Sequence, residues 1–297
     1  MNPKPKSKLK RPFYSVVIPA LNEEGYIADT IESLKKQSYS SKFEIIVVDN
    51  NSSDNTAKVA KLAGAKVFYE NNAGVCWARN SGTLVAKGDI IISTDADTVY
   101  SKNWLANIDK IFAKYPNIVA VAGPCKFNDA PWWGNIFTGF LFGLVNFGFR
   151  TFNKTYYGSG TNIAFKKDTW EGYDTSLTQG GDELDLLRRL RKKGNIYFDI
   201  KNPTYTSSRR LTRGLFYNFF ITFLIFYILE YNLSRIFKRP VLGMYPKFRK
   251  DSKPHKLFLI RVGVLCLVFF IIILGAYKAK YIVLASPIHF NFLPKYF

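Results

Sequence analysis

The chain has 297 residues, of which 47% are hydrophobic and 16% aromatic, and its formal net charge is +20. This composition excludes a disordered chain, and three widely spaced cysteines exclude a disulfide framework and a cysteine-based zinc site. Because the two histidines, His255 and His289, lie near the C-terminus, acid–base chemistry in the first two thirds of the chain falls to carboxylates.

The first predicted segment is a basic tail, residues 1–12, which lacks the apolar core of a signal peptide or a membrane span. From Phe13 to Gly123, short β-branched runs alternate with helical stretches, a pattern typical of a doubly wound α/β sheet. Several runs are apolar at successive positions, which indicates parallel strands buried on both faces. The predicted strands are 14–18, 43–48, 66–69, 89–93 and 118–122, and the predicted helices are 27–36, 56–62, 76–85 and 104–113.

Polar side chains follow three of these strands, at the edge where such sheets gather ligands. Asn22, Asp49 and Asp95 stand at these positions, and Asp97 follows two residues after Asp95. Side chains two apart on an extended chain point the same way, so these two carboxylates can converge on one divalent cation. An Asp-rich turn without a metal is the alternative.

The middle of the chain is unusually apolar over residues 132–153, where Arg150 is the only charge. Its run rich in Phe, Leu and Gly, residues 136–152, is shorter than the roughly 20 residues that a membrane span needs. It therefore predicts either a helix or hairpin near a membrane or an ordinary core helix. A polar α/β stretch resumes over residues 157–206.

Residues 211–297 are predicted to be membrane-associated, with apolar segments at 215–233 and 257–277 and a strongly basic linker between them. Two full spans would place this linker outside the cell, against the tendency of basic loops to stay in the cytoplasm. We therefore expect the first segment to lie in the interface or re-enter, and the second to span. The protein is expected at the cell membrane with its catalytic domain on the cytoplasmic side.

Four polar segments occur in a fixed order along the chain: 19–24, 49–56, 71–82 and 95–97. Together, over residues 14–210, they resemble the motifs of the family-2 glycosyltransferases, which have the glycosyltransferase-A fold. The resemblance implies an α/β, Rossmann-like nucleotide-diphospho-sugar transferase domain at residues 13–210, followed by C-terminal membrane helices.

The resemblance assigns a nucleotide-sugar donor to the first two segments. Pro19, Asn22 and Glu23 match the first nucleotide-binding loop, and Asp49 matches the acidic residue that accepts a hydrogen bond from the base. Asn50 stands where the family often has a second aspartate, which leaves a UDP-sugar and a GDP-sugar both open. Asp54 matches a position near the next helix, where capping is an equal alternative.

The resemblance assigns a divalent cation, Mg or Mn, to Asp95 and Asp97, which would hold it against the donor diphosphate. Arg79 would hold the nucleotide or orient these carboxylates, with a structural ion pair as its alternative. Arg209 and Arg210 would close on the same phosphates, or anchor the chain beside the membrane. The Gln-X-X-Arg-Trp motif of processive synthases is absent near here, which favours a single transfer.

On the acceptor side, residues 157–165 and the start of a predicted helix at Asp182-Glu183 resemble the family. Family members commonly show Glu-Asp here, with the aspartate as general base, whereas this chain has the reverse order. Glu183 takes the base position, and Asp182 is close enough to replace it. The alternative is that Asp182 caps the helix, while Glu183 and Asp185 favour its positive end.

The sequence thus predicts a metal-dependent, inverting family-2 glycosyltransferase of hexosyltransferase type that takes part in glycan biosynthesis. It would move one sugar from a nucleotide sugar to a hydroxyl acceptor on a lipid-linked or cell-surface glycan. The alternatives are a polyprenyl-phosphate glycosyltransferase resembling the dolichyl-phosphate sugar synthases and a non-catalytic nucleotide-sugar-binding membrane protein. The basic charge alone would suit nucleic acid, but no recognised motif supports such a partner. The oligomeric state is not predicted.

Overall fold

The computed structural model describes residues 12–177 and 181–237, all within one unit, Met1–Tyr245; the second unit, Pro246–Phe297, lies outside the described residues. A main sheet has the strand order β3-β2-β1-β4-β8-β6-β9. A small second sheet has the order β5-β10-β7. The strands of the main sheet are β1 (Tyr14–Ala20), β2 (Phe43–Asp49), β3 (Lys66–Tyr69), β4 (Ile90–Ser93), β6 (Ile118–Ala122), β8 (Ile163–Lys166) and β9 (Asn195–Phe198). Those of the small sheet are β5 (Thr98–Val99), β7 (Cys125–Phe127) and β10 (Thr204–Thr206).

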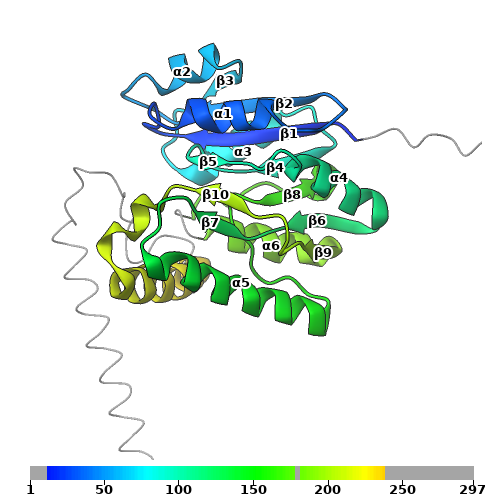
Figure 1. Cartoon of the computed structure of the whole chain (residues 1–297), viewed down its shortest axis with the longest axis vertical. Helices are drawn as coiled ribbons and strands as arrows, with labels where there is room; N and C mark the ends of the chain where they lie inside the picture. The colour runs from blue at the N-terminus through cyan, green and yellow to red at the C-terminus, as the bar shows by residue number, and fades with distance from the viewer. Residues whose placement is uncertain (1–11, 178–180, 238–297) are drawn as a thin grey trace, which may run out of the picture. The chain divides into compact units, whose positions relative to one another are not determined.

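Helices cover both faces of the main sheet (Figure 1). One face packs against α1 (Ile27–Lys35), α2 (Thr56–Leu62) and α4 (Trp104–Lys114). The other packs against α3 (Val75–Val85), α5 (Trp132–Phe152) and α6 (Asp182–Lys193). Shorter segments complete the described chain: the 3₁₀ helices η1 (Lys167–Thr169) and η2 (Ser208–Arg213), the π-helical η3 (Tyr217–Glu230), and α7 (Tyr231–Phe237).

The main sheet is mixed, which corrects the prediction of a doubly wound parallel sheet up to Gly123. β3, β2, β1 and β4 run parallel to one another, as predicted. The predicted fifth strand, β6, does not pair with β4, because β8 lies between them and is antiparallel to both. Residues 163–165 of β8 are buried, and such an apolar run does not reveal the direction of its neighbours.

The apolar stretch 132–153 forms one helix, α5, so the hairpin alternative was wrong. Its inner side buries Gly134, Thr138 and Phe142, while its outer side leaves large apolar side chains exposed. The helix therefore combines a core face with an unpacked face. The exposed apolar residues of α5 are Trp132, Ile136, Phe140, Leu144, Phe147 and Phe152.

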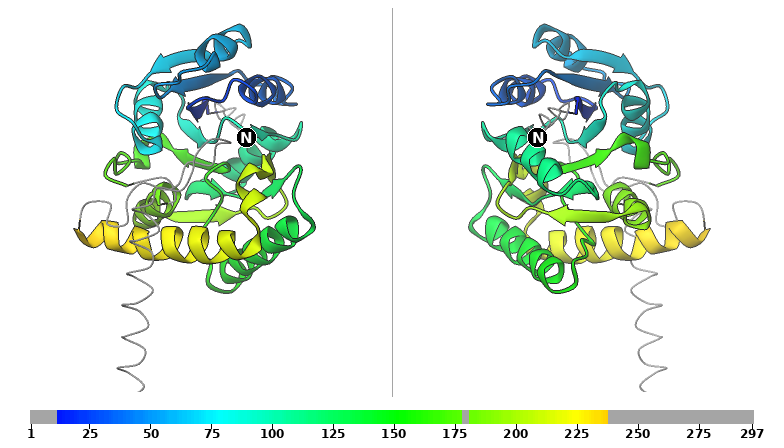
Figure 2. Two further views of the ribbon diagram at one scale, coloured as in Figure 1. Left: turned by 90° about the vertical axis from the view of Figure 1, so that its left-hand side faces the viewer. Right: turned by 90° about the vertical axis from the view of Figure 1, so that its right-hand side faces the viewer.

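The first predicted membrane segment, 215–233, corresponds mainly to η3 and the beginning of α7. Within residues 12–177 and 181–237, no helix has both the length and the apolar character needed to cross a bilayer. The second predicted segment, 257–277, lies outside the described residues. In both views of Figure 2, η3 runs beside α5 on the side of the molecule away from α1 and α2.

Candidate active site

Asp95 and Asp97 lie just beyond the end of β4, in the turn that leads to β5. A hydrogen bond from α1 stabilises the backbone of this turn: Thr30 Oγ1 donates a 2.8 Å hydrogen bond to the carbonyl oxygen of the buried Ala96. Asp97 Oδ1 accepts a 3.2 Å hydrogen bond from Thr206 Oγ1 on β10. The small sheet therefore positions the Asp97 carboxylate through a residue that lies 109 positions later in the sequence.

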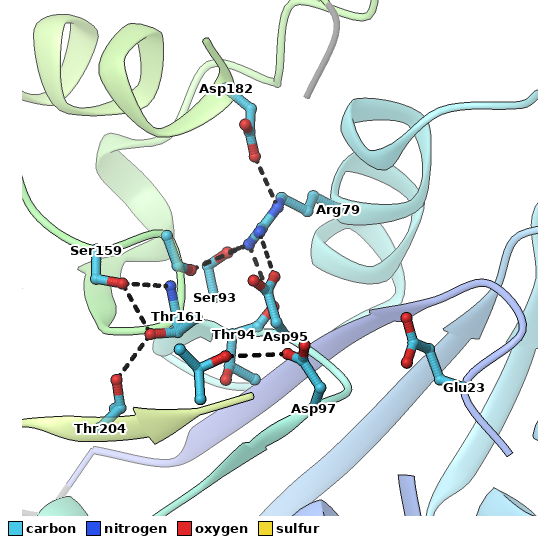
Figure 3. A network of polar contacts seen from close by, with 12 residues as sticks. Glu23, Arg79, Ser93, Thr94, Asp95, Asp97, Ser159, Thr161, Asp182 and Thr204 are labelled. Atoms are coloured by element: carbon cyan, nitrogen blue, oxygen red, sulfur yellow. Dashed lines mark hydrogen bonds and ion pairs between the residues drawn. The ribbon is translucent and has the colours of Figure 1, made fainter. Parts of the chain in front are cut away.

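Arg79 connects the two halves of the site. It lies on α3, which approaches the sheet closely because Gly82 has no side chain: a Cβ there would lie 2.4 Å from Cγ1 of Val17. The Arg79 side chain is buried, with Nη2 2.7 Å from Asp95 Oδ1 and Nε 2.9 Å from Asp182 Oδ2 (Figure 3). Further donations go to the hydroxyl of Ser93 and to the carbonyl oxygens of Thr94 and Gly160.

Burial and neighbouring charges perturb this group of residues. Burial lowers the pKa of Arg79, but Asp182 and Asp95 outweigh it and raise the pKa overall, so the guanidinium stays charged. Burial raises the pKa of Asp95; Arg79 opposes this rise, and the like charge of Asp97 adds to it. Two crowded carboxylates with oxygen ligands suit a hard divalent cation whose shell is completed by diphosphate oxygens.

Asp182 and Glu183 open α6 beside this cluster. The helix begins at Asp182, and its N-cap position is occupied by Gly181, whose predecessor lies among residues not described. The alternative that Asp182 caps the helix was therefore wrong; its carboxylate is turned to Arg79 instead. Burial, and then the charge of Asp182 and a hydrogen bond with it, raise the pKa of Glu183 well above its usual value.

The third carboxylate of this turn, Asp185, has a structural role. It is buried, and its two oxygens each lie 2.6 Å from an arginine of the same helix, Arg188 and Arg189. A buried carboxylate with two charged partners is satisfied within its own helix. Asp185 is therefore distinct from Asp182 and Glu183, which face the cavity described below.

The predicted donor loops meet at the ends of β1 and β2. Asn22 adopts a left-handed backbone with φ of 53°, and its side chain exchanges hydrogen bonds with Ser53. Asp49 at the end of β2 is buried, and its Oδ1 has no hydrogen-bond partner among the residues the structure describes. Since buried polar atoms are usually hydrogen-bonded, this oxygen fits the prediction of a bound donor group. Pro19 lies within β1, one residue before its end.

Asn50 and Asp54 organise these loops. The Asn50 side chain donates to the carbonyl oxygens of Glu70 and Asn72, and its oxygen accepts from the Gly74 amide at the start of α3. An aspartate could not make the two donations, which gives a physical reason for asparagine here. Asp54 accepts from the backbone amide and hydroxyl of Thr56, in agreement with its capping alternative.

The predicted phosphate-side arginines lie on η2, and Arg209 reaches the carboxylates directly. Its guanidinium makes two hydrogen bonds to Glu23, at 2.6 and 2.7 Å, and lies 2.9 Å from Asp97 Oδ2. Arg209 thus connects Glu23 of the first donor loop with Asp97 of the predicted metal site, and its positive charge lies beside the Asp97 carboxylate. Arg210 lines the cavity next to Asp95 and Asp97.

A cavity of about 150 Å³ runs from these charged groups to a wall of apolar side chains. Pro19, Asn22, Glu23, Asp49 and Arg209 do not line it. Sequence reasoning missed its apolar wall, because Phe142 lies 40 residues before the α6 carboxylates and only tertiary packing brings them together. The lining residues of the polar end are Arg79, Asp95, Asp97, Asp182, Glu183 and Arg210, and those of the apolar end include Phe127, Phe137, Leu141, Phe142 and Leu211.

The chain is similar to known proteins in sequence and in fold. The sequence profile of the family described as Glycosyl transferase family 2 matches residues 15–172, more than half of the chain. The chain is 28% identical over 263 residues to a Haloferax volcanii protein named glucosyl-dolichyl phosphate glucuronosyltransferase, covering 81% of each chain. It is 41% identical over 90 residues to the 4,4'-diaponeurosporenoate glycosyltransferase of Staphylococcus haemolyticus, covering 28% of this chain and 24% of that relative.

Other matches are shorter or structural. Matches to two further bacterial glycosyltransferases span 28% and 33% of those relatives. A mannosyltransferase from Pyrobaculum calidifontis, solved with GDP-Man and Mn²⁺, superposes with a TM-score of 0.59 at 18% identity, covering 84% of this chain and 68% of that chain. Residues 1–349 of the Staphylococcus aureus protein TarS give a TM-score of 0.52 at 18% identity, covering 66% of this chain and 60% of that chain. These structures share the α/β fold of the chain.

Proposed function

The chain belongs to glycosyl transferase family 2, and we propose that it is a metal-dependent inverting enzyme that transfers one sugar from a nucleotide sugar to a hydroxyl acceptor. The observation that carries the proposal is the Arg79 bridge, which holds Asp95 of the donor side and Asp182 of the acceptor side on one guanidinium. Membership of an enzyme family argues against the non-catalytic alternative.

The donor side has the groups that a nucleotide diphosphate requires. Asp95 and Asp97 would hold Mg or Mn, which would offset the negative charge that develops on the leaving diphosphate. Arg210 lies at the same end of the cavity, and Arg209 reaches Asp97 from η2. The unpartnered oxygen of Asp49 suits the imide N–H of a uracil or the N1–H of a guanine equally. Mn²⁺ and GDP-Man in the Pyrobaculum structure support this donor class.

On the acceptor side, Glu183 would act as the general base. Asp182 is engaged with Arg79, whereas no cation lies within ion-pair distance of Glu183 among the described residues. The raised pKa of Glu183 suits a group that must take a proton from a hydroxyl. As the acceptor oxygen bonds to the anomeric carbon, the bond to the diphosphate breaks and the hydroxyl proton passes to Glu183. Attack from the face opposite the diphosphate inverts the anomeric centre.

The acceptor would be a lipid-linked glycan. The name of the Haloferax relative, which covers 81% of this chain, includes a glucosyl-dolichyl phosphate and supports this acceptor class. A polyprenyl phosphate is the second candidate. A phosphate is already ionised near neutral pH and needs no base, so the buried Glu183 favours the hydroxyl.

The enzyme would work at the cytoplasmic side of the cell membrane, with α5 in the interface. The outer side of α5 exposes Phe140, at 67%, and Phe147, at 66%. Such side chains in a row on one helix are typical of an interfacial surface. Nearby charges are mostly positive, including the exposed Arg150 and Lys154, which suits anionic lipids.

The test is a binding and turnover screen of UDP- and GDP-sugars with and without Mn²⁺. At least one donor is expected to raise the melting temperature of the full chain in the presence of metal and to be consumed. Asp97→Ala should abolish both effects, and the exposed Asp29→Ala, on α1, should leave them intact. A wild-type chain that neither binds nor hydrolyses any donor would refute the enzyme proposal.

A further inference from the structure

The apolar end of the cavity has no role in the sugar transfer described above. It is formed mainly by Phe137, Leu141 and Phe142 of α5, with Leu211 of η2 beside them. The ring of Phe142 is packed in place, because it stacks against the ring of Tyr157 at 5.8 Å between centroids. A metal ion and a diphosphate need polar ligands, so the groups proposed above for the polar end do not account for this wall.

The same cavity contains the carboxylate proposed as the base. Glu183 lies at its polar end, and Leu141 and Phe142 lie at its apolar end. A ligand that fills the whole cavity must therefore carry a hydroxyl at one end and hydrocarbon at the other. Because Glu183 and the apolar wall line the same cavity, the hydroxyl and the hydrocarbon belong to neighbouring parts of that ligand.

We propose that this apolar wall binds the first part of a hydrocarbon chain, and that the acceptor is an amphiphile whose chain begins within about one sugar of the reacting hydroxyl. The proposal rests on the proposed function and specifies its acceptor. It excludes a long glycan whose lipid remains far from the active site.

The surroundings of the wall agree with such a ligand. α5 and η3 lie side by side, and the rings of Phe137 and Phe219 meet at 6.3 Å between centroids (Figure 1). The side chains that face outward on this pair are also apolar, including Leu144 of α5 and Phe220 of η3. Arg150 and the buried Glu230 are the only charged residues within the two segments. The lining and the outer surface are thus both suited to a lipid.

Alkyl glucosides with chains from methyl to octyl provide a direct probe, used below their micelle concentrations. Their binding to the full chain can be measured by calorimetry, independently of donor and metal. For each methylene buried on the wall, affinity should increase about fourfold. In an octyl oligosaccharide, a terminal sugar placed at Glu183 would hold the octyl chain farther from the wall, so this compound should bind more weakly than octyl glucoside.

Two variants locate the effect. Leu141→Trp fills the apolar end and should remove most of the dependence on chain length, while Phe137→Ala enlarges it and should favour longer chains. Leu62→Trp, at a leucine of α2 that is 79% exposed, is the matched control and should behave as wild type. Far-ultraviolet circular dichroism, which does not depend on the proposed function, reports whether each variant is folded.

Three results would overturn the inference. The first is equal affinity for alkyl glucosides of all chain lengths, and the second is an equal dependence of affinity on chain length in wild type and Leu141→Trp. The third is that no alkyl glucoside binds to a full chain that still binds a donor, which is expected if another segment of the chain fills the cavity. Failure of the proposed function gives a different result. In that case the donors do not bind, while the alkyl series still depends on chain length and on Leu141.

Discussion

Replacing Arg79 with methionine tests the central ion pair of the site. Methionine keeps the length and apolar character of the side chain but removes the guanidinium. Asp182, whose side chain is 3% exposed, would then be buried without a cation. Asp95, at 25% exposed, would lose its partner too but can be solvated better. The substitution therefore acts mainly through Asp182.

The expected loss is large because the pair is buried. Removing one partner of a buried ion pair costs about 3–5 kcal/mol, mostly through the charge left behind. Neutralising that charge should restore part of the stability. In the double variant Arg79→Met with Asp182→Asn, we expect a total loss smaller than the sum of the single losses by about 1–3 kcal/mol.

Urea unfolding of the full chain, followed by tryptophan fluorescence, measures these differences. The matched control is Lys36→Met, which breaks an exposed helical pair with Glu32 and should cost no more than about 0.5 kcal/mol. If Arg79→Met loses less than about 1 kcal/mol, or if the double variant is strictly additive, Arg79 does not hold Asp182 in the way described here.

Three other perturbations test the remaining parts of the site. Burial raises the pKa of Glu183, so kcat/KM should fall as the pH decreases through that raised pKa, and Glu183→Gln should remove both turnover and this limb. Because ionised Glu183 is unfavourable in the folded state, Glu183→Gln should also unfold at a higher temperature than wild type at neutral pH. This difference in melting temperature should shrink as the pH falls towards 4.5, the usual pKa of a glutamate. Equal melting temperatures of the two proteins at all pH values would contradict the raised pKa. Arg209 competes with a cation for Asp97, so Arg209→Ala should bind Mn²⁺ about fivefold more tightly by electron paramagnetic resonance, and weaker binding would instead make Arg209 a supporting residue. Phe140→Asp with Phe147→Asp should reduce flotation of the full chain with anionic vesicles more than tenfold, whereas undiminished flotation would remove α5 from the interface.

Much of the donor half of the fold could be predicted from local sequence. Apolar runs such as residues 45–48 identify buried strands, and the carboxyl ends of parallel strands meet at one edge, which brings Asp49 and Asp95 to the same side of the sheet. The place of β8 could not be predicted in this way. It depends on pairing between β4 and a strand about 70 residues later, and a buried run fits a parallel or an antiparallel neighbour equally well.

The contacts of the charged residues were also beyond sequence reasoning. Arg79 and Asp182 are 103 residues apart, and Arg209 and Glu23 are 186 apart, so nothing in the local pattern pairs them. Only the residue types and their order, compared with a family, indicated that they share a site. The resemblance left Asp182 and Glu183 as alternative bases, because they are adjacent in the sequence and chemically similar.

The fold separates the roles of these two neighbours by geometry. Successive residues at the start of a helix point in directions about 100° apart, and of these two only Asp182 forms an ion pair with Arg79 among the described residues. Gly82 lets α3 approach the sheet, which brings Arg79 within 2.9 Å of Asp182. Burial raises the pKa of Glu183, and the neighbouring Asp182 adds to the rise. The carboxylate paired with Arg79 thus increases the proton affinity of the proposed base, and Asp182→Asn should lower the pKa seen in the pH profile while Glu183 still supports turnover.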